Sequence, residues 1–202
     1  MSKIFPWDYH SDLTEERLKI VAAMLVDGRH AALERFDEEA GDNGWTHGCR
    51  AFQFCRHRIL RAIDAETYGW LTAIDRTLQL IFKIGEVPVR IYKGDADEPT
   101  DRTLRQTFGE LRQLEMLFPE HAEGRDLAYR FAVETDVDGS VLAVKFVGLR
   151  GESAVLIWDV PLDELDAFAG TVGREASESV ELAPPSVGLR TDRDVAEGGA
   201  GA

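Results

Sequence analysis

A chain of 202 residues with 44% apolar residues and ten Phe can bury a sizeable core, which excludes an intrinsically disordered protein. Its formal net charge of −14 disfavours direct binding of nucleic acid or anionic membrane through the bulk surface. No apolar run is long enough to span a bilayer, and the N-terminus lacks the apolar stretch of a secretory signal. We therefore expect a cytoplasmic protein.

Two helices are expected in the first third of the chain. Residues 13–38 carry apolar side chains at helical spacing, with Asp12 as N-cap and Glu15 completing an acidic variant of the capping box. Gly28 allows a break in this helix, because glycine costs about 1 kcal/mol relative to alanine in a helix interior. A second helix is expected over 46–65. Its buried stripe would be Phe52, Cys55, Ile59, Leu60 and Ile63.

The segment 78–95 predicts a β-hairpin. Gly85 supplies the positive φ of a type II′ turn, with Glu86 as the second turn residue. The register would be Ile84–Val87, Phe82–Val89 and Leu80–Ile91. One face of the hairpin is then apolar, whereas the other is cationic and aromatic.

A second hairpin is predicted at Asp138-Gly139, a typical type I′ turn sequence. The register would be Val137–Ser140, Thr135–Leu142, Val133–Val144 and Phe131–Phe146. The strand 153–159 alternates apolar residues on both faces, which favours a central place in the sheet. Further helices are expected over about 100–118 and from Pro161 onward.

The elements follow the order ααββαβββα. We predict one α+β domain over residues 1–174, with an antiparallel sheet of about five strands packed by helices. Residues 175–202 are small, acidic and rich in Gly and Pro, which predicts a disordered tail.

The cationic residues are concentrated in the middle of the chain. Residues 50–112 hold eleven Lys and Arg against nine Asp and Glu, whereas the segments on either side are net negative. If the second helix, the first hairpin and the following Arg102 and Arg105 meet, they form a site for phosphate, carboxylate or an acidic protein surface. Pairing of each cation with neighbouring acids is the alternative that such residues usually adopt. The candidate binding residues are Arg50, His57, Arg61, Lys83, Arg90, Tyr92 and Lys93.

Metal-ligating and catalytic patterns are weak. The set His47, Cys49, Cys55 and His57 has zinc-type ligands, but its spacing matches no recognised zinc module. We therefore predict no metal and no cofactor. Trp45 is expected to pack at a core edge, and no motif of a known catalytic site is present.

The leading hypothesis is a non-enzymatic cytoplasmic binding or regulatory protein, similar in role to an antitoxin or immunity protein. It would bind a protein partner or a small anionic ligand through the basic face of 50–61 and 78–95. One alternative is an enzyme acting on a phosphorylated or nucleotide substrate, with His57 as acid–base. The other is an acidic mimic of nucleic acid.

Overall fold

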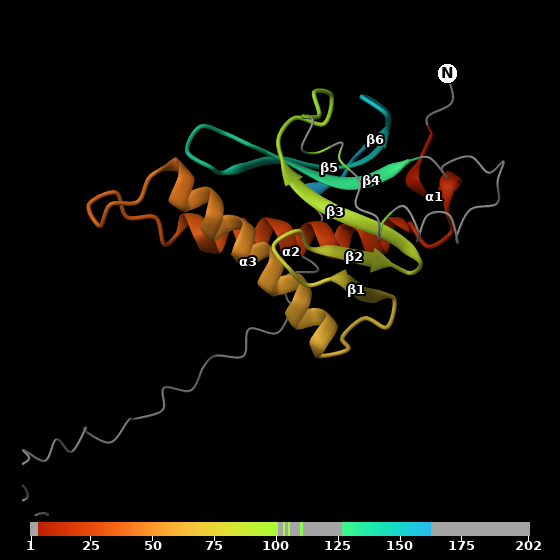
Figure 1. Ribbon diagram of the computed structural model, residues 1–202, viewed down its shortest axis with the longest axis horizontal. Coiled ribbons are helices and arrows are strands. Elements are labelled where there is room, and N and C mark those ends of the chain that lie inside the picture. The colour runs from red at the N-terminus through yellow and green to blue at the C-terminus, as the bar shows by residue number, and fades with distance from the viewer. Residues whose placement is uncertain (1–3, 101–102, 104, 106–109, 111–126, 163–202) are drawn as a thin grey trace, which may run out of the picture.

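The computed structural model describes residues 4–100, 103, 105, 110 and 127–162, which form an α+β fold (Figure 1). Its helices are α1 (Pro6–Tyr9), α2 (Glu15–Leu33) and α3 (Gly44–Asp64). The strands are β1 (Leu71–Asp75), β2 (Ile81–Ile84), β3 (Val87–Lys93), β4 (Ala128–Thr135), β5 (Val141–Arg150) and β6 (Ser153–Asp159). The helices expected over 100–118 and after Pro161, and the tail 175–202, lie largely or wholly outside the described residues. No helix in the described ranges is long and apolar enough to cross a membrane.

The strands form one sheet in the order β1-β2-β3-β4-β5-β6. Neighbouring strands are antiparallel except β3 and β4, which pair in parallel. The expected α+β fold with a mostly antiparallel sheet is confirmed, but the sheet has six strands where about five were expected, and one of its strand pairs is parallel. Residues 94–127 separate β3 from β4, and a chain segment of this length is what a parallel crossover requires.

The first hairpin forms as predicted. Phe82 pairs with Val89 and Ile84 with Val87, and Gly85 has φ +60°. Leu80 precedes the strand, where it has φ +37° and is fully buried. The predicted pairing of Leu80 with Ile91 is therefore absent from this hairpin.

Strand β1 was not predicted from the sequence. Leu71 pairs with Ile84 and Ala73 with Phe82, and the N–H of Gly85 donates to the carbonyl of Trp70 at 2.7 Å. The strand is short, and its sequence, LTAID, has no clear alternation of apolar and polar residues. Its position is set by the hairpin against which it pairs.

The second hairpin has the predicted strands but a different turn. Gly139 has φ +93°, whereas Asp138 is not at positive φ, so the turn is not type I′. The N–H of Gly139 donates to the carbonyl of Asp136, and the N–H of Asp136 donates to the carbonyl of Ser140. These bonds define a three-residue loop with Gly139 in the left-handed bulge position.

A bulge in β5 restores the register that this loop displaces. Thr135 pairs with Val141, not with Leu142 as predicted, and the register shifts before the next pair. Beyond the bulge Val133 pairs with Val144, as predicted. Leu142 is the extra residue and is 62% exposed.

Strand β6 lies at the edge of the described sheet, contrary to the expectation of a central strand. Both of its faces are nevertheless apolar, because each face packs against a different hydrophobic cluster. Leu156 and Trp158 belong to the main core, whereas Ala154 and Ile157 pack on a smaller cluster on the opposite face of the sheet.

Helix α2 begins later than predicted. Its N-cap is Thr14, whose hydroxyl accepts from the N–H of Arg17. The expected cap, Asp12, accepts from the N–H of Glu86 at 3.1 Å and from the guanidinium of Arg17 at 2.6 Å. Asp12 therefore connects the start of α2 to the first hairpin turn.

Helix α2 continues through Gly28 without a break. A Cβ on Gly28 would lie 2.8 Å from the backbone nitrogen of Cys55 on α3. The glycine is thus required for the close approach of the two helices, which outweighs its low helix propensity.

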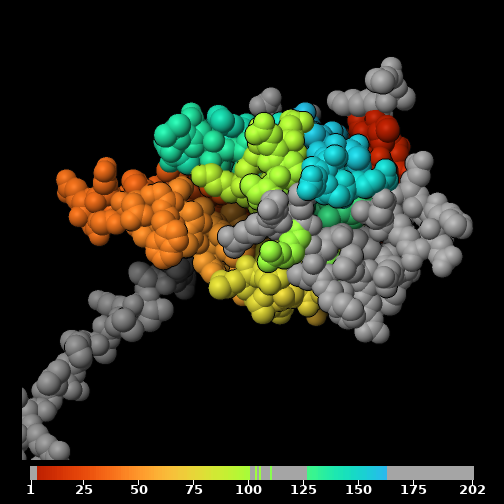
Figure 2. All heavy atoms as spheres, turned by 45° about the horizontal axis from the view of Figure 1, so that its top comes forward, coloured from red at the N-terminus to blue at the C-terminus, as the bar shows by residue number. Residues whose placement is uncertain are grey.

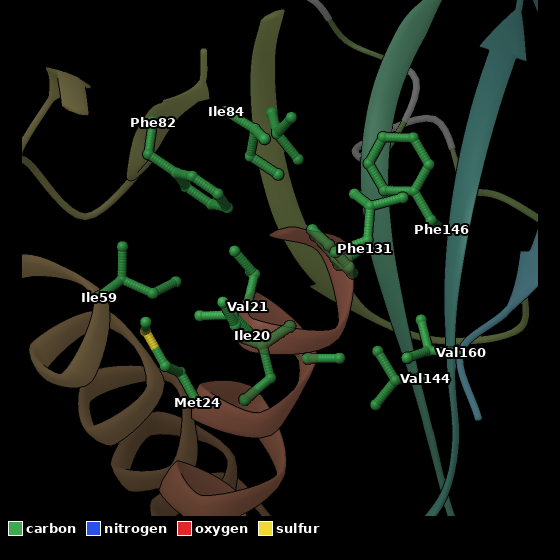
Figure 3. Packing of buried hydrophobic residues seen from close by; sticks show 14 of the residues in the cluster. Ile20, Val21, Met24, Ile59, Phe82, Ile84, Phe131, Val144, Phe146 and Val160 are labelled. Carbon is green, nitrogen blue, oxygen red and sulfur yellow. The ribbon is translucent and has the colours of Figure 1, made fainter. Parts of the chain in front are cut away.

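The main core lies between α2, α3 and one face of the sheet, here called the inner face (Figure 3). Val21 and Met24 of α2 lie between Ile59 of α3 and the strands, from which Phe82 and Phe131 contribute. Cys55 and Ile59 are buried as predicted, whereas Phe52 and Ile63 are only partly buried. The opposite face of the sheet is called the outer face. It carries the smaller cluster Ala96, Ala128, Ala132, Val147 and Leu149.

Candidate functional site

Two arginines of α3, Arg50 and Arg58, bind carboxylates of the α2–α3 loop and of α2. Arg50 binds both carboxylate oxygens of Asp42, at 2.7 and 2.9 Å, and also donates to the carbonyl of Arg35 at 2.5 Å. Hydrogen bonding from Arg50 lowers the pKa of Asp42 to about 2. Arg58 pairs with Asp27 at 2.7 Å. Two of these arginines therefore hold the α2–α3 loop and α2 against α3, and both His57 and Arg61 are exposed.

Lys83 and Arg90 of the first hairpin lie on the outer face of the sheet, because Lys83 pairs with Pro88, which precedes Arg90 by two residues. Lys83 pairs with Glu86 at 2.9 Å. Arg90 and Tyr92 alternate with core residues and lie on the outer face, where the hydroxyl of Tyr92 donates to the carbonyl of Asp95. Burial raises the pKa of Tyr92 to about 12.

The candidate residues therefore divide into separate groups. Lys93 and Arg50 both lower the pKa of His47 by their charge, so they lie near the start of α3. Arg90 lies on the outer face, whereas α3 packs on the inner side with α2. The enzyme alternative requires His57 close to Arg90, and the two residues belong to these different layers. Arg102 lies outside the described residues.

The outer face contains a buried ion network that the sequence analysis missed. Arg90 and Arg130 are directly paired in the parallel register of β3 and β4, and Glu110 lies within 3.5 Å of Arg90 and 2.6 Å of Arg130. Arg130 and Glu110 are each 1% exposed. Burial lowers the pKa of Arg130, and the adjacent carboxylate partly opposes this. Arg130 interrupts the otherwise apolar run 127–133, and this interruption could have indicated a buried ion network from the sequence.

A second buried polar group lies at one end of the inner face. Arg29 of α2 and His47 of α3 are each 6% exposed. A Cβ on Gly139 would lie 2.5 Å from Nε2 of His47. The ring of Phe36 packs edge-on against the imidazole ring of His47, with 5.8 Å between the ring centroids. Burial, followed by the charge of Arg29, lowers the pKa of His47. Arg29 lies four residues after Leu25, which places it on the apolar stripe of α2. This position in the sequence could have indicated that Arg29 is buried.

The surface around His47 is apolar and acidic. Trp45 is 76% exposed, Val137 is fully exposed and Phe36 is 40% exposed, so the expectation that Trp45 packs at a core edge is wrong. The β4–β5 turn and the α2–α3 loop lie at the same end of the molecule (Figure 2). We call this surface the acidic–apolar end. It comprises Phe36, Trp45 and Val137 with the exposed acids Glu34, Asp37, Glu38, Glu39, Asp136 and Asp138, and it also includes the exposed Arg35.

The cysteines and histidines of the zinc-type set are dispersed. Cys49 is exposed, whereas Cys55 is buried and its thiol donates to the carbonyl of Leu25. Burial raises the pKa of Cys55 to about 12. Across the described ranges, no group of three or more His, Cys, Asp or Glu is placed to hold a metal ion.

Comparisons of the chain with protein-family models, with curated proteins and with solved structures found no match. The functional argument therefore depends on the geometry of the described residues.

Proposed function

We propose that the protein is a non-enzymatic binding protein that docks a partner protein through the acidic–apolar end. The observation that carries the proposal is the exposure of Trp45, which is 76% solvent-accessible at the same end of the molecule as the fully exposed Val137. Tryptophan is the residue type most often responsible for binding energy at protein interfaces, and neighbouring exposed apolar side chains are typical of such surfaces.

The surface is held in a defined shape before a partner arrives. Asn43 caps α3 by accepting from the N–H groups of Trp45 and Thr46, and Thr46 accepts from the N–H of Asn43. Arg50 fixes the preceding loop through Asp42. A surface ordered in this way loses less conformational entropy on binding.

The chemistry of the surface determines the kind of partner. Apolar side chains at its centre require an apolar pocket, and the surrounding carboxylates require cations. The partner is therefore a protein with a basic rim around an apolar depression. The basic-face residue Arg50 supports this surface from within, because its guanidinium is engaged by Asp42.

Site-specific photo-crosslinking in the native host tests the proposal. A crosslinking amino acid at position 45 is expected to trap one basic protein, and the trapped yield should fall with added salt because exposed charge pairs are screened. The same amino acid at Leu78 is the control, since this side chain is 70% exposed in the β1–β2 connection.

Purified variants then identify the contact. The double variant Trp45→Ala, Val137→Ser should lose binding to the trapped protein, with Leu78→Ser as the matched exposed control. Equal capture from positions 45 and 78, or unchanged binding by the double variant, would show that this end is not the docking surface.

A further inference from the structure

Five buried polar atoms at one end of the inner face have no hydrogen-bond partner within the described part of the chain. They are Nε and Nη2 of Arg29, Nδ1 and Nε2 of His47, and Oγ1 of Thr135. Buried polar groups are nearly always hydrogen-bonded in native proteins, so a cluster of this kind requires an explanation.

The fold brings these three residues to the same end. Thr135 ends β4 and continues the inner-face alternation of Phe131 and Val133. The turn that follows it packs on His47 through Gly139. After burial, the charge of Arg29 has the largest effect on the pKa of His47, which it lowers. Helix α2, helix α3 and the β4–β5 hairpin therefore each contribute one residue.

The pattern of unpartnered atoms points to the shape of what would satisfy them. Nε and Nη2 form one edge of the guanidinium, and two parallel N–H groups on that edge match two oxygens of a carboxylate or phosphate. The hydroxyl of Thr135 and one ring N–H of His47 can each donate to a further oxygen.

No acid of the described chain supplies that group. Asp42 and Asp138 are the carboxylates whose charge couples to His47. Asp42 is bound by Arg50, and Asp138 accepts from the N–H and hydroxyl of Ser140 at 2.9 and 2.6 Å. A buried guanidinium without a counterion is strongly unfavourable, so an external anion would remove a substantial penalty.

We infer that Arg29, His47 and Thr135 form a binding site for a small oxyanion, a carboxylate or phosphate group. Arg29 binds two of its oxygens through Nε and Nη2, and the other two residues donate to the remaining oxygens. This site lies behind the acidic–apolar end and does not depend on partner docking, because Arg29, His47 and the hydroxyl oxygen of Thr135 are buried whereas Trp45 is exposed.

Thermal unfolding of the full chain tests the site with inorganic phosphate and with acetate as separate probes. Chloride at equal ionic strength is the reference. At a concentration 100-fold above its Kd, the preferred anion should raise the Tm by about 5 °C or more. A response to phosphate alone identifies a phosphate site, and a response to acetate alone identifies a carboxylate site.

Variants separate specific binding from a general salt effect. Arg29→Met should abolish the rise in Tm, and Thr135→Val should reduce it. Arg58→Met is the matched control, since Arg58 forms a partly exposed pair on α3, and it should respond as the wild type does. Calorimetric titration of the wild-type chain provides a measurement that does not depend on any variant folding.

Two results would overturn the inference. One is an equal rise in Tm for the wild type and Arg29→Met, which would indicate only general exclusion of the salt from the protein surface. The other is the absence of any response to both anions, which would mean that buried water satisfies these donors.

Discussion

Arg130 and Arg29 are buried on opposite faces of the same sheet, and they differ in what neutralises them. Arg130 on the outer face is bound by Glu110 at 2.6 Å and donates to the carbonyl of Tyr129. Arg29 on the inner face has two unpartnered nitrogens and no ion pair with a described residue, whereas Arg130 has one unpartnered nitrogen, Nη2, beside its ion pair. The outer face therefore contains its own counterion, whereas the inner face lacks one.

The comparison separates a structural arginine from a candidate binding arginine. Both residues are costly to bury, and both have a pKa lowered by burial. Removing the counterion of Arg130 should therefore harm the fold, whereas removing Arg29 should not.

Glu110→Gln should lower the free energy of unfolding by about 3–5 kcal/mol, because Arg130 would keep its buried charge without a carboxylate. In the same chloride buffer, Arg29→Met should leave the stability unchanged or raise it, since it removes an uncompensated charge. Urea titration of both variants against the wild type measures the difference. Equal losses in the two variants would mean that Arg29 also has an internal counterion, which would contradict the comparison.

The close contact of α2 with α3 offers a second test of the difference between Arg29 and Arg130, because Arg29 directly follows Gly28 at this contact. Gly28→Ala should lower the free energy of unfolding by about 1–3 kcal/mol, because the new methyl group meets the backbone of Cys55 and overpacks the contact. Arg29 is the next residue on α2, so a shift of the two helices should expose its side chain and disturb the proposed anion site. The rise in Tm caused by the anion should therefore be smaller in this variant.

Gly48→Ala is the matched control for this second prediction. Gly48 lies inside α3 with nothing within 4 Å of its added Cβ, so alanine should stabilise the helix by about 0.5–1 kcal/mol. If both substitutions stabilise the protein, Gly28 is not needed for helix contact.

The sequence predicted those parts of the fold that depend on local patterns. The register of the first hairpin follows from a two-residue turn and matching apolar faces, and it was confirmed at Phe82 and Ile84. The second hairpin was right beyond its turn, since the bulge at Leu142 offsets the longer loop. Strand β1 and the parallel pairing of β3 with β4 were missed because contacts between distant segments decide them, and no local pattern encodes such contacts.

The candidate site was less predictable than the fold. The candidate cations were chosen because Lys and Arg are abundant in residues 50–112. In the structure Arg50, Lys83 and Arg90 each lie beside a carboxylate, so abundance did not indicate free cations. The more informative arginines, Arg29 and Arg130, are those that interrupt apolar patterns. Such an arginine indicates burial, but only tertiary structure reveals whether a counterion lies beside it.

The smallest of the three effects concerns the pH dependence contributed by His47. Burial and neighbouring cations lower the pKa of His47, so the unfolded chain binds a proton more readily than the folded chain does. Stability should therefore fall as the pH drops through the ordinary histidine pKa of 6.5, and it should stop falling below the folded-state pKa. The charged groups that act on His47 come from every neighbouring element: Arg29, Lys93, Arg50, Asp42 and Asp138.

Urea titrations between pH 7.5 and 5.5 measure this contribution in the wild type, in His47→Gln and in His57→Gln as the exposed control on the same helix. His47→Gln should lose less stability over this range than the wild type, and His57→Gln should behave as the wild type does. Bound oxyanion should reduce the wild-type loss, because a protonated His47 would then face a negative charge and no longer only the guanidinium of Arg29. If saturating phosphate or acetate leaves the pH dependence unchanged, the anion does not lie beside His47, and the inner face must then be neutralised in another way.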